Sequence, residues 1–548
     1  MPGPRLPDSL NPTSIAFGTA AWTGTVANWP LWQSLSRLPE MGSLRGTVFI
    51  MGFMLAVVAL SFALLALLAT RFTIKPAAVL FILAAAFGAH FMGAYGVVLD
   101  PTMMTNMLQT DVRETRDLLS WRMLVVVLLL AGPPLWALRR VKVAPSAALR
   151  QIARNGVAVV ASIAVVAVIV FALFADLSAT MRNHKQLRYQ INPLNSFFSL
   201  AVLAAQGQAK PAGPPEAIGL DAAALPRAAG AKPPLLLLMI GETARADHFS
   251  LNGYARPTNI ELAQRQVLSF TDVSSCGTST AASLPCMFSH LGRKAFNAGG
   301  REQENLTDLL QRAGYAVLWL DNQAGCKGIC ARVPSAMAGE AVGGDIHALQ
   351  GLCDAEGECF DEALLRGLDQ RLAALPAERR AKGVVLVLHQ MGSHGPAYFK
   401  RSPPANKRFM PECTTNVLQQ CEHDALINAY DNSIAYTDHV LAGAIDWLKT
   451  HEGDHAPAML YVSDHGESLG ENNLYLHGLP YAVAPREQTH VPMVVWMPVT
   501  DPLLPCLASK TAQAFSHDNL FHTVLGLVGV RAKEYQAALD MTASCRQK

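Results

Sequence analysis

Cysteine is missing from the first 275 residues, and strong net charge is missing from the chain as a whole. The 548 residues carry a formal net charge of only +2, which gives no support to nucleic-acid binding because that function needs a basic surface. Charged residues are also absent from Thr47 to Leu68. At a rise of about 1.5 Å per residue, this run crosses a hydrocarbon core of about 30 Å and predicts a membrane span.

Further apolar runs predict a membrane domain of five helices. Hydrophobic residues make up 51% of the chain and concentrate in its first third, which favours membrane spans over several soluble domains. The other four runs are Ser14 to Leu35, Pro76 to Val98, Met123 to Leu138 and Gly156 to Phe174. His90 is nearly the only ionisable side chain within the runs, so they mark no path for an ion or solute. This argues against a transporter, or a sensor that only binds a ligand, as the alternative class.

Basic residues in two short loops indicate the orientation of the spans. Arg71 and Lys75 lie in one loop, and the other holds Arg139, Arg140, Lys142, Arg150 and Arg154. Cytoplasmic loops are enriched in Lys and Arg, so we expect both loops and the N-terminus inside, and everything after about Asp176 outside. The start shows no cleavable signal peptide, and the first span is expected to act as the export signal.

All ten cysteines lie after residue 275, in the part that is expected outside the cytoplasm. An even number of cysteines in an oxidising compartment predicts disulfides. Local spacing suggests the pairs Cys276–Cys286, Cys326–Cys330, Cys353–Cys359 and Cys413–Cys421, which leaves Cys506–Cys545. A zinc cluster is the alternative, disfavoured because Cys-x-x-Cys pairs are absent.

Composition divides the chain into three parts. Residues 1–180 hold the spans, and residues 181–233 combine a connecting or membrane-surface helix with a linker rich in Ala, Pro and Gly. Residues 234–548 alternate short apolar runs with helical patterns, which predicts an α/β domain with a mostly parallel sheet. The expected strands are Leu235–Ile240, Ala316–Leu320, Val384–Leu388, Met459–Val462 and Val491–Trp496, and the expected helices are Asn305–Arg312, Asp361–Leu375 and Ile427–Leu448.

Acidic and imidazole side chains follow three of these strands. Glu242 comes after the first, His389 after the third, and Asp464 with His465 after the fourth. Ligands collect at the carboxyl ends of parallel strands, so we expect these residues at one edge. A single carboxylate there often only caps a helix, but an adjacent Asp and His suit a divalent metal. Mixed oxygen and nitrogen ligands favour zinc, with manganese or calcium as alternatives.

A hydroxyl-rich turn, Ser275 to Cys286, lies between these motifs in the sequence. Its candidate nucleophiles are Thr278, Ser279, Thr280 and Ser283. A metal can activate such a hydroxyl, and a helix beginning near Thr280 would direct its N–H groups at a phosphoryl group. The alternative is a turn that only caps a helix. Two histidines on glycine-flanked loops, His394 and His477, and Lys327 between two cysteines are candidates for substrate contact.

Three sequence blocks resemble the lipid A phosphoethanolamine transferases, a family that includes the mobile colistin-resistance enzymes. The blocks are Gly241–Tyr254, Ser275–Thr280 and Ser463–Gly470. The resemblance implies a five-helix transmembrane domain followed by an α/β/α, alkaline-phosphatase/sulfatase-like domain in the periplasm, anchored in the inner membrane of a Gram-negative bacterium. It implies a monomer that moves phosphoethanolamine from phosphatidylethanolamine to a phosphate of lipid A, with polymyxin resistance as the consequence.

The resemblance also implies roles for individual residues. Thr280 matches the nucleophile that becomes phosphoethanolaminylated, and Glu242, Asp464 and His465 match zinc ligands whose site Thr280 completes. Residues that match substrate-contacting positions are Asn106, Thr110, Glu114, Lys327, His394 and His477. The last two histidines are expected to hold a second, weaker zinc ion, and one of them is expected to act as general acid and base.

One position departs from the family pattern, and two other activities stay open. Gln323 stands where the family often has asparagine in its substrate pocket. The acceptor could instead be a lipopolysaccharide core sugar or a periplasmic glucan. A sulfatase-like hydrolase is a further alternative, although sulfatases usually place a modified cysteine or serine where Thr280 stands.

Overall fold

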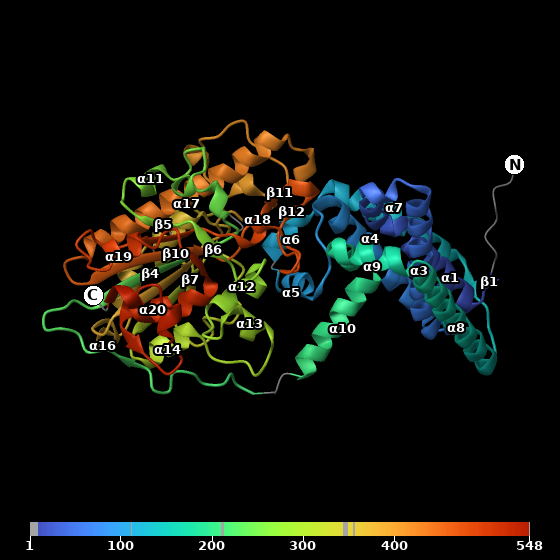
Figure 1. Ribbon diagram of the computed structural model, residues 1–548, viewed down its shortest axis with the longest axis horizontal. Helices are drawn as coiled ribbons and strands as arrows, with labels where there is room; N and C mark the ends of the chain where they lie inside the picture. Colours follow the sequence, from blue (N-terminus) through green and yellow to red (C-terminus); the bar gives the residue numbers. More distant parts are fainter. Residues whose placement is uncertain (1–8, 111, 210–212, 343–348, 355–356, 547–548) are drawn as a thin grey trace. The chain divides into compact units, whose positions relative to one another are not determined.

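The N-terminal part of the chain folds as a bundle of helices (Figure 1). The computed structural model describes residues 9–110, 112–209, 213–342, 349–354 and 357–546. They form two units, one of Met1–Met104 with Leu119–Ala205 and the other of Thr105–Leu118 with Gln206–Lys548. The segment Thr105–Leu118 therefore packs with the C-terminal unit, although it lies between two apolar helices in the sequence.

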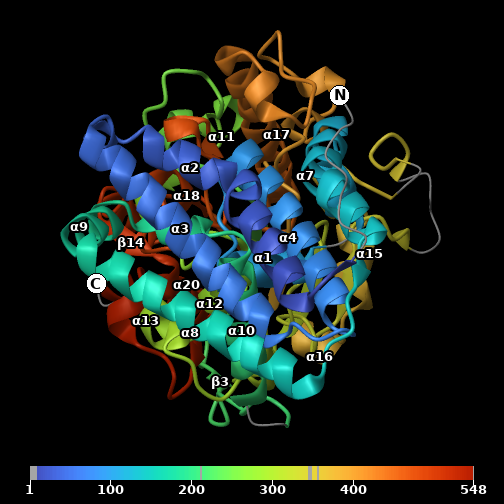
Figure 2. The ribbon, with the colours of Figure 1, turned by 90° about the vertical axis from the view of Figure 1, so that its right-hand side faces the viewer.

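Four helices of the first unit are long and apolar enough to cross a membrane. They are α3 (Leu44–Leu67), α4 (Ile74–Tyr95), α7 (Trp121–Arg140) and α8 (Ala148–Ala172). Helix α3 packs against α8 and against the shorter α1, and α4 packs against α7; Figure 2 shows α1, α3 and α8 alongside one another. These four helices match four of the five predicted spans.

The predicted first span, Ser14 to Leu35, is not one helix. It is divided into α1 (Pro12–Gly24), a 3-10 turn η1 (Val26–Asn28) and α2 (Trp29–Ser36). Pro30 has no N–H with which a continuous helix would bond the carbonyl four residues earlier. The described residues therefore contain four helices of spanning length, not five.

Shorter helices complete the connections of this part of the chain. They are α5 (Pro101–Gln109), α6 (Val112–Leu118), α9 (Phe174–Asn183) and α10 (Leu194–Ala209). A short parallel pair joins β1 (Ser9–Leu10) to β2 (Lys142–Val143). This pair ties the start of α1 to the segment that precedes α8.

A seven-stranded sheet forms the centre of the second unit, in the order β5-β13-β10-β4-β9-β7-β8. The strands are β4 (Pro234–Gly241), β5 (Leu268–Phe270), β7 (Ala316–Asp321), β8 (Ser335–Met337), β9 (Val384–His389), β10 (Ala456–Ser463) and β13 (Met493–Trp496). Five neighbouring strands, from β10 to β8, run parallel. All five predicted strands are present, but β13 runs antiparallel to β10.

Helices cover both faces of this sheet (Figure 1). Helices α11 (Ile260–Ala263) and α17 (His423–Thr450) lie on one side, and α12 (Thr280–Met287), α14 (Leu306–Arg312) and α20 (Leu520–Val528) lie on the other. The apolar run Leu235–Ile240 is buried along its whole length, as expected for a strand covered on both faces. The C-terminal unit is therefore the predicted α/β/α domain.

One predicted helix of this unit is interrupted. Residues Asp361–Leu375 form a 3-10 turn η8 (Asp361–Leu365) and a separate α15 (Leu368–Ala374). Gly367 between them has a φ of +68°, a left-handed conformation that glycine adopts readily and that ends a helix. The other two predicted helices are present as α14 and the longer α17.

The ten cysteines form five disulfides. Their pairing is the one that local spacing predicts, including the long closure Cys506–Cys545. The zinc-cluster alternative is therefore wrong for the cysteines.

Candidate active site

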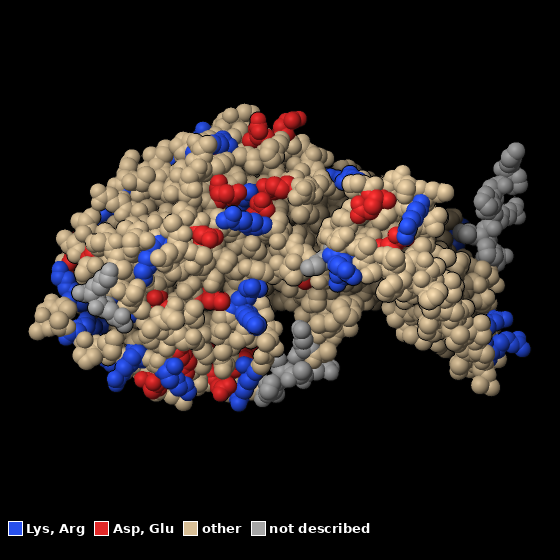
Figure 3. Space-filling view, in the orientation of Figure 1, with Lys and Arg blue, Asp and Glu red and all other residues tan. Residues whose placement is uncertain are grey.

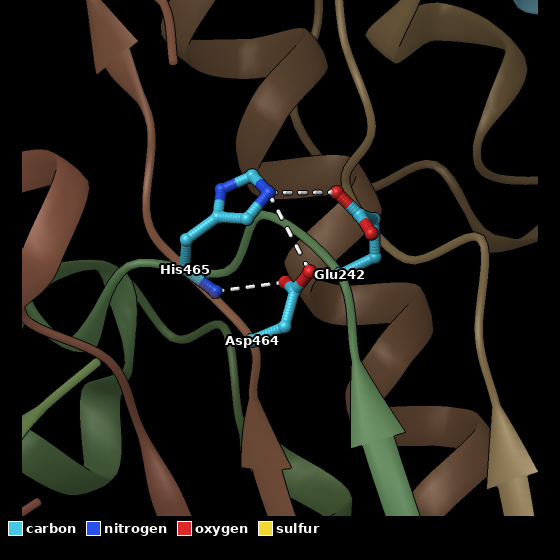
Figure 4. A group of neighbouring side chains, drawn as sticks. All are labelled: Glu242, Asp464 and His465. Carbon is cyan, nitrogen blue, oxygen red and sulfur yellow. Dashed lines mark hydrogen bonds and ion pairs between the residues drawn. The ribbon is translucent and has the colours of Figure 1, made fainter. Parts of the chain in front are cut away.

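Two neighbouring parallel strands end at the same level and place the acidic side chains together. Gly241 at the end of β4 pairs with Ser463 at the end of β10, so Glu242 and Asp464 leave the sheet side by side. With His465 they form a fully buried group whose ligand atoms lie within 4.8 Å of one another (Figure 4). The Nε2 atom of His465 is 3.2 Å from Glu242 Oε1 and 3.5 Å from Asp464 Oδ2.

Backbone contacts orient these side chains toward a common point. The Nδ1 atom of His465 donates to the carbonyl oxygen of Gly466 at 2.9 Å, which leaves Nε2 to face the carboxylates. The Oδ1 atom of Asp464 accepts from the N–H groups of Thr243 and His465 at 3.2 and 2.7 Å. Within the described chain, Asp464 Oδ2 has no hydrogen-bond partner although it is buried. That oxygen and the His465 Nε2 atom face each other and Glu242 across the centre of the group, where a metal ion would be held.

The electrostatics of this group favour a bound cation. Burial and the Glu242 carboxylate raise the pKa of Asp464 to about 7. Burial alone would lower the pKa of His465, but the carboxylates of Asp464 and Glu242 outweigh it and raise that pKa to about 10. Two buried carboxylates with one imidazole are costly without positive charge between them. The donor set of two carboxylates and one imidazole fits a divalent metal such as zinc.

Thr280 is the hydroxyl that reaches this group. Helix α12 begins at this residue, which meets the condition under which its N–H groups would face a bound phosphoryl group. Its Oγ1 atom donates to Glu242 Oε2 at 2.8 Å and lies 3.5 Å from His465 Nε2. The hydroxyl therefore stands next to two metal-ligand candidates and at the positive end of a helix.

The other hydroxyls of the turn are directed elsewhere. Thr278 donates to the carbonyl oxygen of Leu479 at 2.6 Å, and Ser283 donates to that of Asp464 at 2.5 Å. The Ser279 hydroxyl is buried and makes no hydrogen bond within the described residues. Of the four candidate nucleophiles, only Thr280 contacts a carboxylate of the site.

His517 holds the hydroxyl-rich turn against the end of β10, a role that no sequence pattern marks. Its Nδ1 atom accepts from the N–H of Cys276 at 3.0 Å, and its Nε2 atom donates to the carbonyl of Ser463 at 2.9 Å. Burial lowers the pKa of His517 to about 4, so the ring is neutral and both bonds keep their direction. The disulfide Cys276–Cys286 closes the same turn.

Gln323 contacts the acidic group directly. It lies after β7, is 2% exposed, and its Nε2 atom donates to Glu242 Oε2 at 2.8 Å. Its own N–H donates to Asp321 Oδ1 at 2.8 Å, which fixes the loop. The sequence marks Gln323 only as a departure from asparagine, whereas in the structure its amide orients a ligand candidate.

His389 lies at the expected sheet edge but outside the metal-ligand group. It is fully buried, and its Nδ1 atom is 3.2 Å from Asp321 Oδ2. The indole of Trp319 donates to the same oxygen at 2.8 Å. His389 is thus paired with Asp321 of the neighbouring strand β7, whereas His465 is paired with Glu242 and Asp464.

Of two further predicted histidines, His477 lies beside His465 and His394 lies beside His477. The ring centroid of His477 is 4.3 Å from that of His465 and 5.7 Å from that of His394. Burial, followed by the charge of His465, lowers the pKa of His477 to about 3. Its Nδ1 atom is 3.3 Å from Glu467 Oε2, a buried carboxylate that sequence reasoning left without a role.

The loop that carries His394 approaches the backbone of Glu242 closely. Gly392 has a φ of +53°, and a Cβ atom there would lie 2.6 Å from the carbonyl oxygen of Glu242. The N–H of Ser393 donates to the same oxygen at 3.0 Å. Glycine at this position lets the loop bring His394 next to the site.

Lys327 lies in the small loop closed by Cys326–Cys330 and faces backbone oxygens. Its Nζ atom donates to the carbonyls of Ala324 at 3.2 Å and Gln109 at 3.3 Å. The second contact places the end of α5 beside the loop that follows Gln323. Lys327 itself makes no hydrogen bond or ion pair with the Glu242 group among the described residues.

The predicted substrate-contacting residues of the membrane half are described in part. Thr110 donates to the carbonyl oxygen of Asn106 at 2.8 Å. Thr110 directly follows Gln109, whose carbonyl oxygen accepts from Lys327. In the described chain no hydrogen bond joins either residue to Glu242 or Thr280. The side chain of Glu114 lies outside the described residues.

Known proteins match both parts of the chain. The family described as "Phosphoethanolamine transferase EptA/EptB" matches residues 57–207, and the family described as "Sulfatase" matches residues 234–530. Phosphoethanolamine transferase EptA of Escherichia coli K12 is 39% identical over 489 residues, which cover 86% of each chain. The chain belongs to the EptA family of phosphoethanolamine transferases.

Two other members of the EptA family align over nearly the full length. Phosphatidylethanolamine transferase Mcr-1 of Escherichia coli is 37% identical over 549 residues, 98% of each chain. The solved structure of the integral membrane protein lipooligosaccharide phosphoethanolamine transferase A from Neisseria meningitidis has a TM-score of 0.91 at 31% identity, covering 98% of this chain and 99% of that one. The predicted fold class, a membrane domain followed by a sulfatase-like α/β domain, is confirmed.

Proposed function

We propose that this chain is a zinc-dependent enzyme that transfers phosphoethanolamine from phosphatidylethanolamine to a phosphate group of lipid A. The contact that carries the proposal is the 2.8 Å hydrogen bond from Thr280 Oγ1 to Glu242 Oε2, beside Asp464 and His465. The names of the relatives support the transferred group and the donor. The meningococcal relative is named for lipooligosaccharide, which supports a lipid-linked sugar phosphate as acceptor.

In the first half-reaction, Thr280 Oγ1 forms a bond to the phosphorus of phosphatidylethanolamine, and the bond from phosphorus to the diacylglycerol oxygen breaks. Thr280 gives up its proton along its hydrogen bond to Glu242. The leaving oxygen takes a proton from His394, whose ring lies 5.7 Å from that of His477; His477, with its pKa lowered to about 3, is neutral and orients the group. The products are diacylglycerol and a phosphoethanolamine ester of Thr280.

In the second half-reaction, an oxygen of a lipid A phosphate attacks the same phosphorus. The bond between phosphorus and Thr280 Oγ1 breaks, Thr280 recovers the proton that Glu242 took in the first step, and the phosphoethanolamine group is now on lipid A. The attacking P–OH group of lipid A gives its proton to His394, which replaces the proton that His394 lost in the first step. Burial of Glu242, Thr280 and His465 keeps water from competing with the acceptor.

Glu242, Asp464 and His465 would hold the zinc ion, with Thr280 Oγ1 completing the site. When bound, zinc supplies positive charge that lowers the pKa of the hydroxyl and stabilises charge on the phosphoryl oxygens. His394 and His477 would hold a second, weaker ion. The proposed substrate contacts are Asn106, Thr110, Glu114, Lys327, His394 and His477.

The location follows from the lipid substrates. Residues 1–180 anchor the enzyme in the inner membrane, residues 181–233 bridge, and residues 234–548 catalyse in the periplasm as part of a monomer. An added ethanolamine offsets one negative phosphate charge and so weakens the attraction of cationic polymyxins to the outer surface. Colistin resistance is the proposed consequence.

Adduct mapping tests this proposal. The purified full-length protein is incubated with labelled phosphatidylethanolamine, and a phosphoethanolamine mass on Thr280 is expected by mass spectrometry. Thr280→Ala should carry no adduct, whereas Ser279→Ala is a matched control that should, because the Ser279 hydroxyl makes no hydrogen bond among the described residues.

Adding the second substrate separates the remaining alternatives. Lipid A should discharge the adduct and gain its mass. Free phosphoethanolamine without an adduct would indicate a hydrolase, and an adduct that passes to a periplasmic glucan but not to lipid A would indicate another acceptor. Either result would refute the proposal as stated.

A further inference from the structure

A groove in the helical unit combines arginine with apolar side chains. It lies between α1, α3 and α8 and has a volume of about 580 Å³. We call it the α1–α8 groove, and the lining residues used below are Phe17, Phe62, Arg150, Ala153, Arg154 and Val157. None of them belongs to the active-site group, and all of them lie within one unit of the structure.

The two arginines present an unneutralised double positive charge. Arg150 and Arg154 are four residues apart on α8, so their side chains lie on the same helix face. In the part of the chain that the structure describes, neither arginine forms an ion pair and no Asp or Glu lines the groove. Both are exposed. Guanidinium groups in such a pair match the oxygens of a phosphate.

Aromatic and aliphatic side chains continue the groove away from the arginines. Phe17 of α1 and Phe62 of α3 meet edge to face, with ring centroids 5.4 Å apart. Val157 lies one turn beyond Arg154 on α8 and is 70% exposed. A ligand that fits both ends therefore has an anionic group next to a hydrocarbon chain.

A partly buried polar network links the helices that line the groove. Thr13 of α1 donates to Asn155 Oδ1 at 3.0 Å, and Gln151 Nε2 donates to Thr13 Oγ1 at 2.9 Å. Asn155 in turn donates to the carbonyl oxygen of Ala69 after α3 at 2.9 Å. These bonds join α1, α8 and the end of α3 through the residues that follow Arg150 and Arg154 in the sequence, so helix packing forms the groove before any ligand enters.

We propose that the α1–α8 groove binds one anionic phospholipid, with its phosphodiester on Arg150 and Arg154 and an acyl chain along Phe17, Phe62 and Val157. Figure 3 shows Lys or Arg side chains gathered beside α8, and basic pockets between membrane helices are typical sites for acidic lipids. With the orientation proposed above, the lipid belongs to the cytoplasmic leaflet. It is therefore distinct from the donor that reacts at Thr280.

Native mass spectrometry of the full-length protein tests the site without turnover, so its outcome is independent of the proposed transferase activity. The protein is delipidated and given phosphatidylglycerol or phosphatidylcholine with identical acyl chains. Two arginines at a membrane surface should favour the anionic lipid by about 30-fold. Arg150→Gln with Arg154→Gln should abolish most of this preference.

Two matched variants separate a built site from general attraction. Arg139→Gln with Arg140→Gln removes the same charge from the end of α7, outside the groove, and should retain the preference. Ala153→Trp keeps both arginines but fills the exposed groove, and should lose the bound lipid. Equal retention of the two lipids by the unaltered protein would overturn the proposal. So would full retention by Ala153→Trp, or an equal loss in the α7 variant.

Discussion

Replacing Gln323 with leucine is the sharpest test of how the acidic group is organised. Leucine has a similar volume but cannot donate the 2.8 Å hydrogen bond to Glu242 Oε2. A buried hydrogen bond to a charged group contributes about 1.5–3 kcal/mol, and partners of metal ligands typically affect metal affinity or activity by about 10–100-fold. We therefore expect zinc affinity to fall about 10–100-fold.

The assay measures two quantities in the same protein. Zinc affinity comes from competition with a chelator, and the rate of adduct formation on Thr280 is measured at low and at saturating zinc. The rate should fall at low zinc and recover in large part at saturation, because the Thr280 hydroxyl keeps its own contact with Glu242.

A matched glutamine is available on the surface. Gln311 of α14 donates to the carbonyl of Arg332 at 3.3 Å, and Gln311→Leu should leave zinc affinity and adduct rate unchanged. If Gln323→Leu keeps both quantities within about twofold of the unaltered enzyme, the amide does not orient Glu242 and the reasoning is refuted.

Three further predictions concern stability, measured as thermal melting of the full chain in detergent. Asp361→Ala removes the acceptor of two backbone N–H groups in the loop before His394, and should cost about 2–4 kcal/mol; an unchanged melting temperature would contradict this. Replacing Cys506 and Cys545 with serine removes a disulfide between residues 39 apart in the sequence, and chain entropy predicts a loss of about 4 kcal/mol of stability. The melting temperature should fall while adduct formation on Thr280 is retained. Loss of the adduct would count against a purely structural role for this disulfide. Burial lowers the pKa of His522 to about 4 in the folded chain, compared with about 6.5 in the unfolded chain. As the pH falls from about 6.5 to 4, the unfolded chain therefore binds a proton at this residue that the folded chain does not, and the folded state loses stability. His522→Asn should reduce the loss between pH 7 and 5 by up to about 2 kcal/mol, and an identical pH dependence would exclude His522 as its source.

Local signals predicted the strands and the disulfides. The run Leu235–Ile240 is apolar without alternation, which is typical of a strand covered on both faces, and the cysteine pairs are mostly close in sequence. Direction and continuity were harder to predict. Nothing in Val491–Trp496 indicates that β13 runs antiparallel, because pairing direction depends on the chain before the strand. The sequence contains the two residues that interrupt helices, Pro30 and Gly367. The apolar residues on either side of each nevertheless favoured the prediction of a continuous helix.

In the site, too, local patterns predicted some residues, whereas others depend on tertiary contacts. Strand ends predicted that Glu242, Asp464 and His465 would meet, because parallel strands place their carboxyl ends at one edge. The residue pattern left four hydroxyls of the turn open, and only the family resemblance pointed to Thr280. The structure adds the physical difference, because Thr280 faces Glu242 whereas Thr278 faces a backbone carbonyl. Gln323 and His517 act through hydrogen bonds to residues distant in the sequence, and no periodicity or spacing encodes such contacts.

Because Gly241 pairs with Ser463, metal binding depends on the correct alignment of β4 with β10. Side chains alternate between the two faces of a sheet, so a slip of one residue between β4 and β10 would send one carboxylate to the opposite face. A slip of two residues would separate the carboxylates along the edge by about 7 Å. A misaligned sheet would therefore be unable to assemble the metal site. Bound metal thus indicates that β4 and β10 are paired in the correct register.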